Sequence, residues 1–333
     1  MLIPRYWATH TAKYRQGRTR FAIQRFGWSL TSQQEAEDMA RTRAGEAVQE
    51  RLAGRKPIRR EPKVPYNGAE GVPIREEIVA THGGIVITRN SYGARCMNVA
   101  DVCFVDVDET PKKERSITIY IFFEILNMAF GFFIIGTMLF TLGASFSIKD
   151  TPSEIYIAWS VIIITGITRY VIHLLSKTTQ KKLTSWLEKL ASEEKNAGFR
   201  LYKTPAGFRV IATHKTFDPA GDEVAQLFKR LRTDPVYALM CLRQKCFRAR
   251  VSAKPWRIGI SDHMRPTRGV WPVSEEKMPR RASWIEAYEK QAAQFAACHF
   301  IATFGSTAMP AEVSAAVQLH DELCAALSDK PCA

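Results

Sequence analysis

Hydrophobic positions along the chain fall into two long runs and several shorter, periodic ones. The first run, residues 117–148, contains a single charged residue, Glu124. A second run covers residues 155–175, and the short polar turn Lys149–Glu154 separates the two. Because about 20 apolar residues in a helix span the hydrocarbon core of a bilayer, this pattern predicts a transmembrane helical hairpin over residues 116–176.

Basic residues on both sides of this segment predict its orientation. They are Lys112, Lys113 and Arg115 before it, and Lys177, Lys181 and Lys182 after it. The positive-inside rule then places both termini in the cytoplasm. The seven cysteines form no CxxC pair, and the N-terminus lacks the apolar core of a signal peptide, which also favours a reducing compartment. We therefore expect a multi-pass protein of the bacterial inner (cell) membrane, in contact with the lipid bilayer. The alternative, a hairpin buried inside a globular protein, would need a large core to cover two helices that are apolar all round.

The shorter periodic segments predict strands and helices in alternation before the hairpin. Residues 20–29 read as a strand, and Ser32 with Glu35 forms a capping box for a helix that ends near Ala53. A helix is expected over Ile74–His82. The run 101–108 reads as a buried strand that ends in acids.

After the hairpin, residues 176–197 form a basic amphipathic pattern that favours packing on a membrane surface. Two strands are expected on either side of the turn Thr204–Gly207, because Pro and Gly there are strong turn residues. Short helices follow near 223–232 and 234–242, and a strand near 246–251. The tail predicts two amphipathic helices, near Trp284–Phe304 and Pro310–Leu327.

Together these elements predict an α+β fold: a cytoplasmic mixed α/β domain interrupted by a two-helix transmembrane hairpin. Five regions are expected: a basic N-terminal strand–helix and linker (1–65), the first half of the cytoplasmic domain (66–115), the hairpin (116–176), the second half (177–281) and a C-terminal helical pair (282–333).

Charge adds a class of partner to this picture. The net charge is +14, and residues 1–65 hold 14 Lys and Arg against 6 Asp and Glu. Residues 240–281 hold 11 against 3, with basic and aromatic residues interleaved. Such surpluses favour nucleic acid, nucleotides or anionic lipid headgroups as partners; a solvated basic surface is the alternative. We expect Trp256 to stack on a base or fill the core, and predict these phosphate-binding residues: Arg209, Arg248, Arg250, Lys254 and Arg257.

The acidic strand end suggests a metal. Asp106 and Asp108 are two residues apart, so on a strand both carboxylates lie on one face. Such a pair can hold a divalent cation such as Mg²⁺ or Mn²⁺ through oxygen ligands. The alternative is a strand that ends in solvated acids. We expect His299 and His320 to be packed or surface histidines rather than ligands.

Two of these motifs resemble the catalytic core of archaeo-eukaryotic primase-polymerases. Phe104–Asp108 is similar to that family's hhhDhD strand, and Thr204–Arg209 to its [S/T]-x-x-G-x-H turn, with Arg209 where the family has a nucleotide-contacting His. The resemblance implies a divalent-metal-dependent nucleotidyltransferase in which Asp106 and Asp108 hold the metal and Arg209 contacts phosphate. For the family's third acid the sequence offers only Asp218 and Asp262, neither of which stands in a matching motif. With segments such as ITRNSYGARC (residues 87–96) and CFRAR-x₃-KPWR (residues 246–257), the whole chain also resembles uncharacterised bacterial two-span membrane proteins. This resemblance implies no function.

Three functional hypotheses stay open on the sequence. The first is an integral membrane protein with a basic cytoplasmic domain that binds a phosphate-bearing partner. The second is the primase-polymerase-like enzyme, and the third is a non-catalytic membrane scaffold. No catalytic residue is assigned, and no cofactor is certain.

Overall fold

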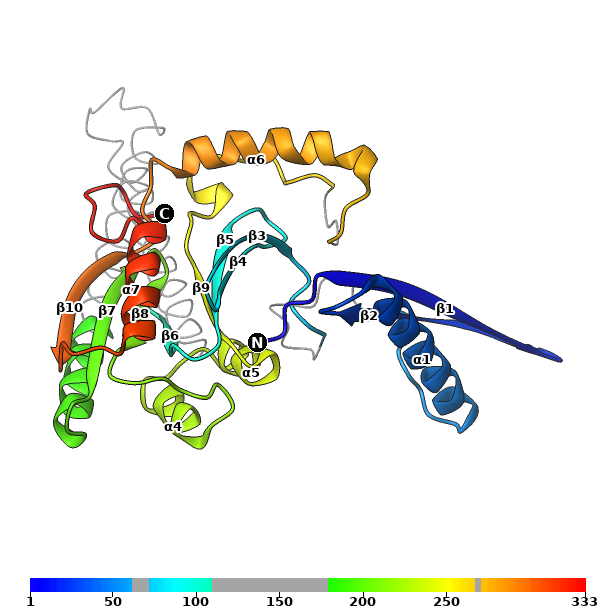
Figure 1. The fold of residues 1–333 in the computed structure, drawn as a ribbon, viewed down its shortest axis with the longest axis horizontal. Coiled ribbons are helices and arrows are strands. Elements are labelled where there is room, and N and C mark those ends of the chain that lie inside the picture. The colour runs from blue at the N-terminus through cyan, green and yellow to red at the C-terminus, as the bar shows by residue number, and fades with distance from the viewer. Residues whose placement is uncertain (62–71, 110–178, 267–270) are drawn as a thin grey trace, which may run out of the picture.

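The computed structural model describes residues 1–61, 72–109, 179–266 and 271–333. These residues form a two-stranded ribbon and two four-stranded antiparallel sheets, together with helices that cover them (Figure 1). The chain is therefore α+β in the parts that the structure describes.

The N-terminal ribbon pairs β1 (Tyr6–Gln16) with β2 (Thr19–Ser29) over their full length. Helix α1 (Gln33–Leu52) packs along one face of it. The Ser32 half of the predicted capping box is confirmed, because its side chain accepts a hydrogen bond from the backbone N–H of Glu35 at 3.2 Å. The Glu35 carboxylate accepts instead from the hydroxyls of Ser29 and Thr31. A glycine is required at position 27, because a Cβ there would lie 2.0 Å from the carbonyl oxygen of Ala36.

The first four-stranded sheet has the order β10-β7-β8-β6. Its strands are β10 (His299–Gly305), β7 (Gly198–Thr204), β8 (Gly207–Ala212) and β6 (Phe104–Asp108). The predicted strand pair is confirmed as β7 and β8, and Gly207 allows the close approach of β6, since a Cβ there would lie 2.1 Å from the carbonyl oxygen of Val107.

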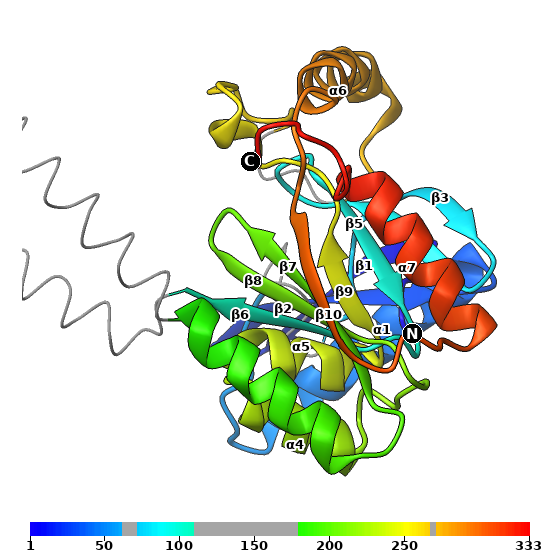
Figure 2. The same ribbon diagram turned by 90° about the vertical axis from the view of Figure 1, so that its left-hand side faces the viewer.

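Helices cover both faces of this sheet. The helical residues 179–193 lie on one side and α7 (Ala311–Cys324) on the other (Figure 2). Leu183 and Leu187 are completely buried in the core that the sheet shares. The interpretation of the 176–197 pattern as membrane-surface packing is therefore wrong for its described part, because this apolar stripe covers the protein's own sheet.

The second sheet has the order β3-β4-β5-β9. Its strands are β3 (Glu77–His82), β4 (Ile85–Arg89), β5 (Arg95–Val99) and β9 (Phe247–Arg250). Tyr237 joins the two sheets: its hydroxyl donates to the carbonyl of Phe104 on β6 and accepts from the N–H of Arg248 on β9. The remaining helices are α4 (Asp222–Arg230), α5 (Pro235–Gln244), α6 (Met278–Ala292) and the short η2 (Pro255–Arg257) and η3 (Glu275–Lys277).

Two helix predictions need correction. The helix expected over Ile74–His82 is instead an extended segment leading into β3, paired antiparallel with β4. The helix expected over Trp284–Phe304 ends as α6 at Ala292, and residues 299–305 form the edge strand β10. Both segments are rich in β-branched and aromatic residues, and pairing with a neighbouring strand overrides their local helical spacing.

The membrane prediction is corrected as well. Among residues 1–61, 72–109, 179–266 and 271–333, no helix is both long and apolar enough to cross a bilayer. Helix α1, for example, has 20 residues but buries only alanines and one valine along a single stripe. The expected hairpin, 116–176, lies outside the described residues. On this finding, the assignments as an integral membrane protein, as a multi-pass inner-membrane protein and as a membrane scaffold are withdrawn.

Candidate functional site

The two predicted acids end β6, the strand next to β8. In the antiparallel register Asp106 lies opposite Arg209, and Asp108 opposite Gly207. The Nε of Arg209 donates to Oδ1 of Asp106 at 2.9 Å, and the Asp106 side chain remains 39% exposed. The structure thus brings Asp106 and Arg209 together on adjacent strands, the geometry that a shared metal–phosphate site requires.

Arg209 is less accessible than a phosphate-binding residue needs to be. Its side chain is 4% exposed and also contacts the carbonyl of Arg250 at 3.1 Å and Nε2 of His320 at 3.3 Å. Burial is the largest single effect and lowers its pKa, but Asp106, Cys298 and Cys324 together outweigh it and hold the pKa above its usual value. Arg209 is therefore a fixed, buried charge that links the acidic strand end to α7.

Arg248 is buried in a different network. Its guanidinium donates to both carboxylate oxygens of Glu76, at 2.7 and 2.6 Å, and to Oδ1 of Asn98 at 2.9 Å. Both bonds to Glu76 come from Nη2, and Nη1 donates to Asn98, so the pair is a short, charge-assisted contact. Its donors are committed to the interior of the protein, so its predicted contact with phosphate stays a prediction without structural support.

The other three predicted cations form a cluster of a different kind. Arg250 ends β9, and Lys254 and Arg257 flank the 3₁₀ turn η2. Within the described parts of the chain none of the three belongs to an ion pair. Two of their buried donor atoms, Nε of Arg250 and Nη1 of Arg257, also lack a hydrogen-bond partner there. Buried donors normally have hydrogen-bond partners. An anion bound among these three cations would supply the missing acceptors.

Electrostatics place the trio beside the acidic strand end. Burial is the main cause that lowers the pKa of Lys254, and the charges of Arg250 and Arg257 add to it. Asp108 and Asp106 act in the opposite direction, and together these effects bring the pKa to about 8. Burial, and then Arg250, lower the pKa of Arg257. Both cations are thus held at an energetic cost, which a bound anion would relieve.

Trp256 presents an exposed aromatic surface next to these cations. Its ring is 57% exposed, and the Nζ of Lys254 lies 5.2 Å from its centroid. The ring of Tyr92 packs against it edge-on, 5.2 Å away at 63°. The ring is therefore held in place rather than buried, which disfavours the core-filling alternative.

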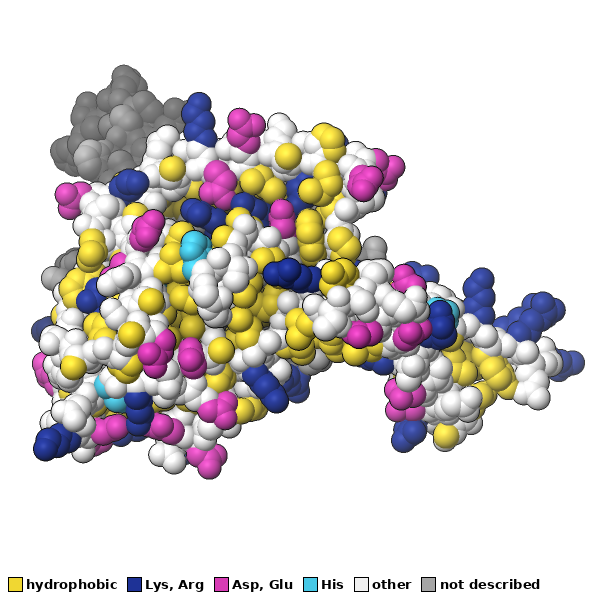
Figure 3. Space-filling model, in the orientation of Figure 1, with side chains coloured by type: hydrophobic (Ala, Val, Ile, Leu, Met, Phe, Trp, Pro, Cys, Tyr) yellow, Lys and Arg dark blue, Asp and Glu magenta, His cyan; other side chains and the backbone are white. Residues whose placement is uncertain are grey.

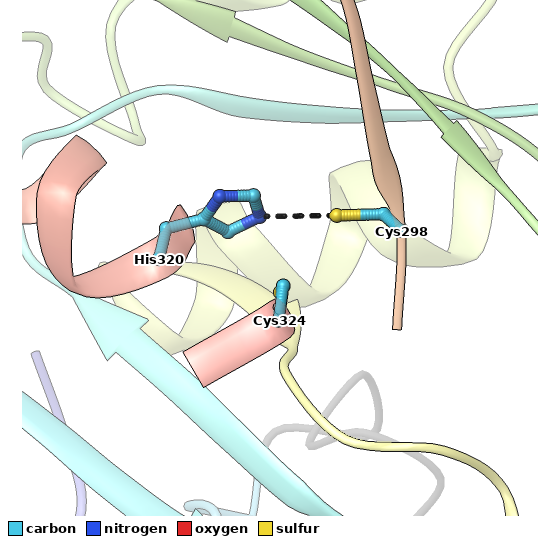
Figure 4. Close-up of side chains that lie close together, drawn as sticks. All are labelled: Cys298, His320 and Cys324. Carbon is cyan, nitrogen blue, oxygen red and sulfur yellow. Dashed lines mark hydrogen bonds between the residues drawn. The ribbon is translucent and has the colours of Figure 1, made fainter. Parts of the chain in front are cut away.

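A second group of side chains, which sequence reasoning did not assemble, can hold a metal ion. The thiols of Cys298 and Cys324 and the imidazole of His320 offer ligand atoms that lie within 4.8 Å of one another, and all three residues are buried. Figure 4 shows Cys298 beside the strand ribbon, immediately before β10, and the other two on α7. The Sγ of Cys298 is 3.9 Å from Nε2 of His320.

The His320 ring is oriented by its neighbours. Its Nδ1 lies 3.0 Å from the carboxylate of Asp321, and Arg209, which can only donate, faces Nε2. In the neutral ring this arrangement places the proton on Nδ1 and leaves the Nε2 lone pair to accept from Arg209, a place that a metal ion would take over. His320 is buried, as expected for a packed histidine, but the expectation did not foresee its two cysteine neighbours. The spacing His320-x₃-Cys324, which places both residues on one helix face, was the sequence signal that could have indicated a shared site.

The cluster changes the expectation about cofactors. Hard cations such as Mg²⁺ and Mn²⁺ prefer the oxygen ligands that Asp106 and Asp108 offer, whereas two thiols and an imidazole suit a softer ion. The ligand group that the described residues form is the one with sulfur and nitrogen atoms, Cys298, His320 and Cys324.

No family model, no curated protein and no solved structure matches this chain.

Proposed function

We propose that this protein binds a nucleotide unit, a phosphate group together with its base, at Arg250, Lys254, Arg257 and Trp256. The observation that supports this most is the pair of buried, partnerless donor atoms on Arg250 and Arg257. Guanidinium groups match phosphate oxygens in geometry as well as in charge. An anion seated among the three cations would supply the missing acceptors.

Trp256 favours a nucleotide over inorganic phosphate. Bases stack on exposed aromatic rings beside basic grooves, and each stacked base contributes about 1–3 kcal/mol. The ring is exposed and adjoins Lys254, so a phosphate on the cations places a base within reach of it. Asp106 and Asp108 are the residues that would hold a Mg²⁺ ion accompanying the phosphates.

The ligand is identified by titrating the whole chain with four probes. These are a nucleoside triphosphate with and without Mg²⁺, inorganic triphosphate, a single-stranded oligonucleotide, and vesicles containing an anionic phospholipid. The proposal predicts saturable binding of the nucleotide or the oligonucleotide that exceeds the binding of inorganic triphosphate. Equal binding of all anions would reduce the site to a charge patch, and exclusive binding of vesicles would contradict the nucleotide proposal.

Affinity should fall as the pH rises through the pKa of Lys254. With its pKa at about 8, Lys254 is mostly charged at pH 7 and mostly neutral at pH 9. An anion prefers the charged form, so nucleotide affinity is expected to drop roughly tenfold between these pH values. The Lys254→Arg variant keeps its charge, and its affinity should stay nearly flat over the same range. A wild-type affinity that does not change with pH would show that Lys254 makes no contact with the ligand.

A second candidate function is zinc binding by Cys298, His320 and Cys324. We infer Zn²⁺ because it takes thiolate and imidazole ligands in tetrahedral sites. Two thiolates would neutralise the double positive charge of the ion. The neighbouring cations Arg209 and Arg200 form ion pairs with Asp106 and Asp321, so their charges are balanced separately. The Asp321 carboxylate on Nδ1 is also the outer partner that metal-bound histidines commonly have.

Metal content tests this candidate. Whole protein purified without chelators is expected to carry about one zinc per chain by elemental mass spectrometry. The Cys298→Ala and Cys324→Ala variants should lose it, while Cys241→Ala, another buried free cysteine, should retain it. Zinc retained by all three variants, or absent from the unmodified chain, would exclude the site.

A further inference from the structure

The tip of the β1–β2 ribbon carries an unusual concentration of positive charge. Lys13, Arg15, Arg18 and Arg20 lie within eight positions around the turn, and all four are exposed. The chain contains no acidic residue before Glu35, so the ribbon has no carboxylate of its own. Figure 3 shows these basic side chains at the far end of the ribbon, away from the body of the protein.

The two faces of the ribbon differ. Tyr14 and Phe21 stack on each other with centroids 5.1 Å apart, on the face where Ile23 packs against Ala47 and Val48 of α1. Lys13, Arg15 and Arg20 alternate with these residues and therefore project from the opposite face. Helix α1 thus stiffens the ribbon from behind and leaves its basic face uncovered.

One pair on that face is unfavourable for the folded ribbon. Arg15 and Arg20 lie directly opposite each other in the register. Like charges across a strand pair are destabilising, with Cβ atoms only about 5 Å apart. An anion bound between or beside the two guanidinium groups would relieve this repulsion.

We propose that the ribbon binds the phosphate backbone of duplex DNA, with its tip in the major groove. Two paired strands of 11 residues extend about 35 Å, and a two-stranded ribbon fits the major groove of B-form DNA. Four cations at the tip match the closely spaced phosphates that border the groove. The contacts that this proposal counts are to phosphates, which carry no sequence information of their own. This site is separate from the nucleotide site at β9 and η2.

The test measures binding of the whole chain to a fluorescent 20-base-pair DNA duplex by anisotropy at several salt concentrations. The plot of log affinity against log salt should have a slope of roughly −3 to −4, from four phosphate contacts. Replacing Arg15 and Arg20 together by Ala should lower the slope by about two and weaken binding tenfold or more. The control, Lys229→Ala with Lys290→Ala, removes the same charge from exposed positions on α4 and α6 and should bind as the unmodified chain does.

Unfolding measurements separate loss of binding from loss of structure. The double Arg15/Arg20 variant should unfold at the same or a higher temperature, because it removes a like-charge pair. Unchanged duplex binding in this variant, or equally tight binding to A-form duplex RNA or to polyglutamate, would overturn the proposal. Replacing Arg250 and Arg257 should leave duplex binding intact, so failure at one site is distinguishable from failure at the other.

Discussion

Replacing Glu76 by alanine is expected to lower the free energy of unfolding by about 3–5 kcal/mol. Glu76 accepts two hydrogen bonds from Arg248, and their side chains are 14% and 7% exposed. Removing the carboxylate leaves a buried guanidinium whose charge is no longer compensated, and the remaining partner, Asn98, supplies only one neutral acceptor. Denaturant unfolding of the purified variant measures the loss.

A matched control comes from an exposed pair. Glu193 contacts Arg230 at 2.5 Å, but the two side chains are 42% and 44% exposed, so Glu193→Ala should change stability by about 1 kcal/mol or less. A double replacement of Glu76 and Arg248 by Leu and Met should recover part of the loss, because no unpaired charge remains. If Glu76→Ala proved no more damaging than the control, the buried pair would not be the joint between β3, β5 and β9 that the structure describes.

Replacing Arg250 and Arg257 together by methionine is expected to weaken nucleotide binding by about a hundredfold or more. Hydrogen bonds to charged groups contribute about 1.5–3 kcal/mol each, and two such donors are lost. Stability should stay the same or rise, because the variant removes two buried donors that have no partner in the described structure. A residue with a purely structural role would show the opposite, a loss of stability with little effect on binding.

Calorimetry and thermal unfolding measure both quantities on the same samples. Arg280→Met, which removes an exposed charge near the start of α6, is the control and should match the unmodified chain in both. If the double variant kept its affinity for the nucleotide, the binding site could not be at Arg250 and Arg257.

Much of the local structure could be predicted from the sequence because its signals are local. The capping box at Ser32, the glycine turn between β7 and β8, and the alternation along 104–108 depend on neighbours within a few positions. These signals located the helix α1, the strand pair and the acidic strand β6. The hairpin expectation also used a local signal, and it is withdrawn because the helices of the described residues carry no apolar run of the required length.

The parts that could not be predicted depend on distant partners. Arg209 and Arg248 look like surface cations in a one-dimensional pattern, yet each is buried beside a carboxylate 103 and 172 positions away. The basic segment 246–257 therefore contains one structural arginine, Arg248, and three cations that form no ion pair within the described residues. No periodicity in the sequence separates the two kinds. The cysteine–histidine cluster likewise joins β10 to α7, and only its His320–Cys324 half has a helical spacing.

The most direct test of the nucleotide site locates the bound ligand on the chain. The whole protein is irradiated with a photoreactive azido-nucleotide, digested, and the labelled peptide is identified by mass spectrometry. The proposal predicts labelling within residues 247–266, centred on Trp256, which excess unmodified nucleotide suppresses. Labelling confined to other regions, or labelling that competitor does not reduce, would contradict the assignment of this site.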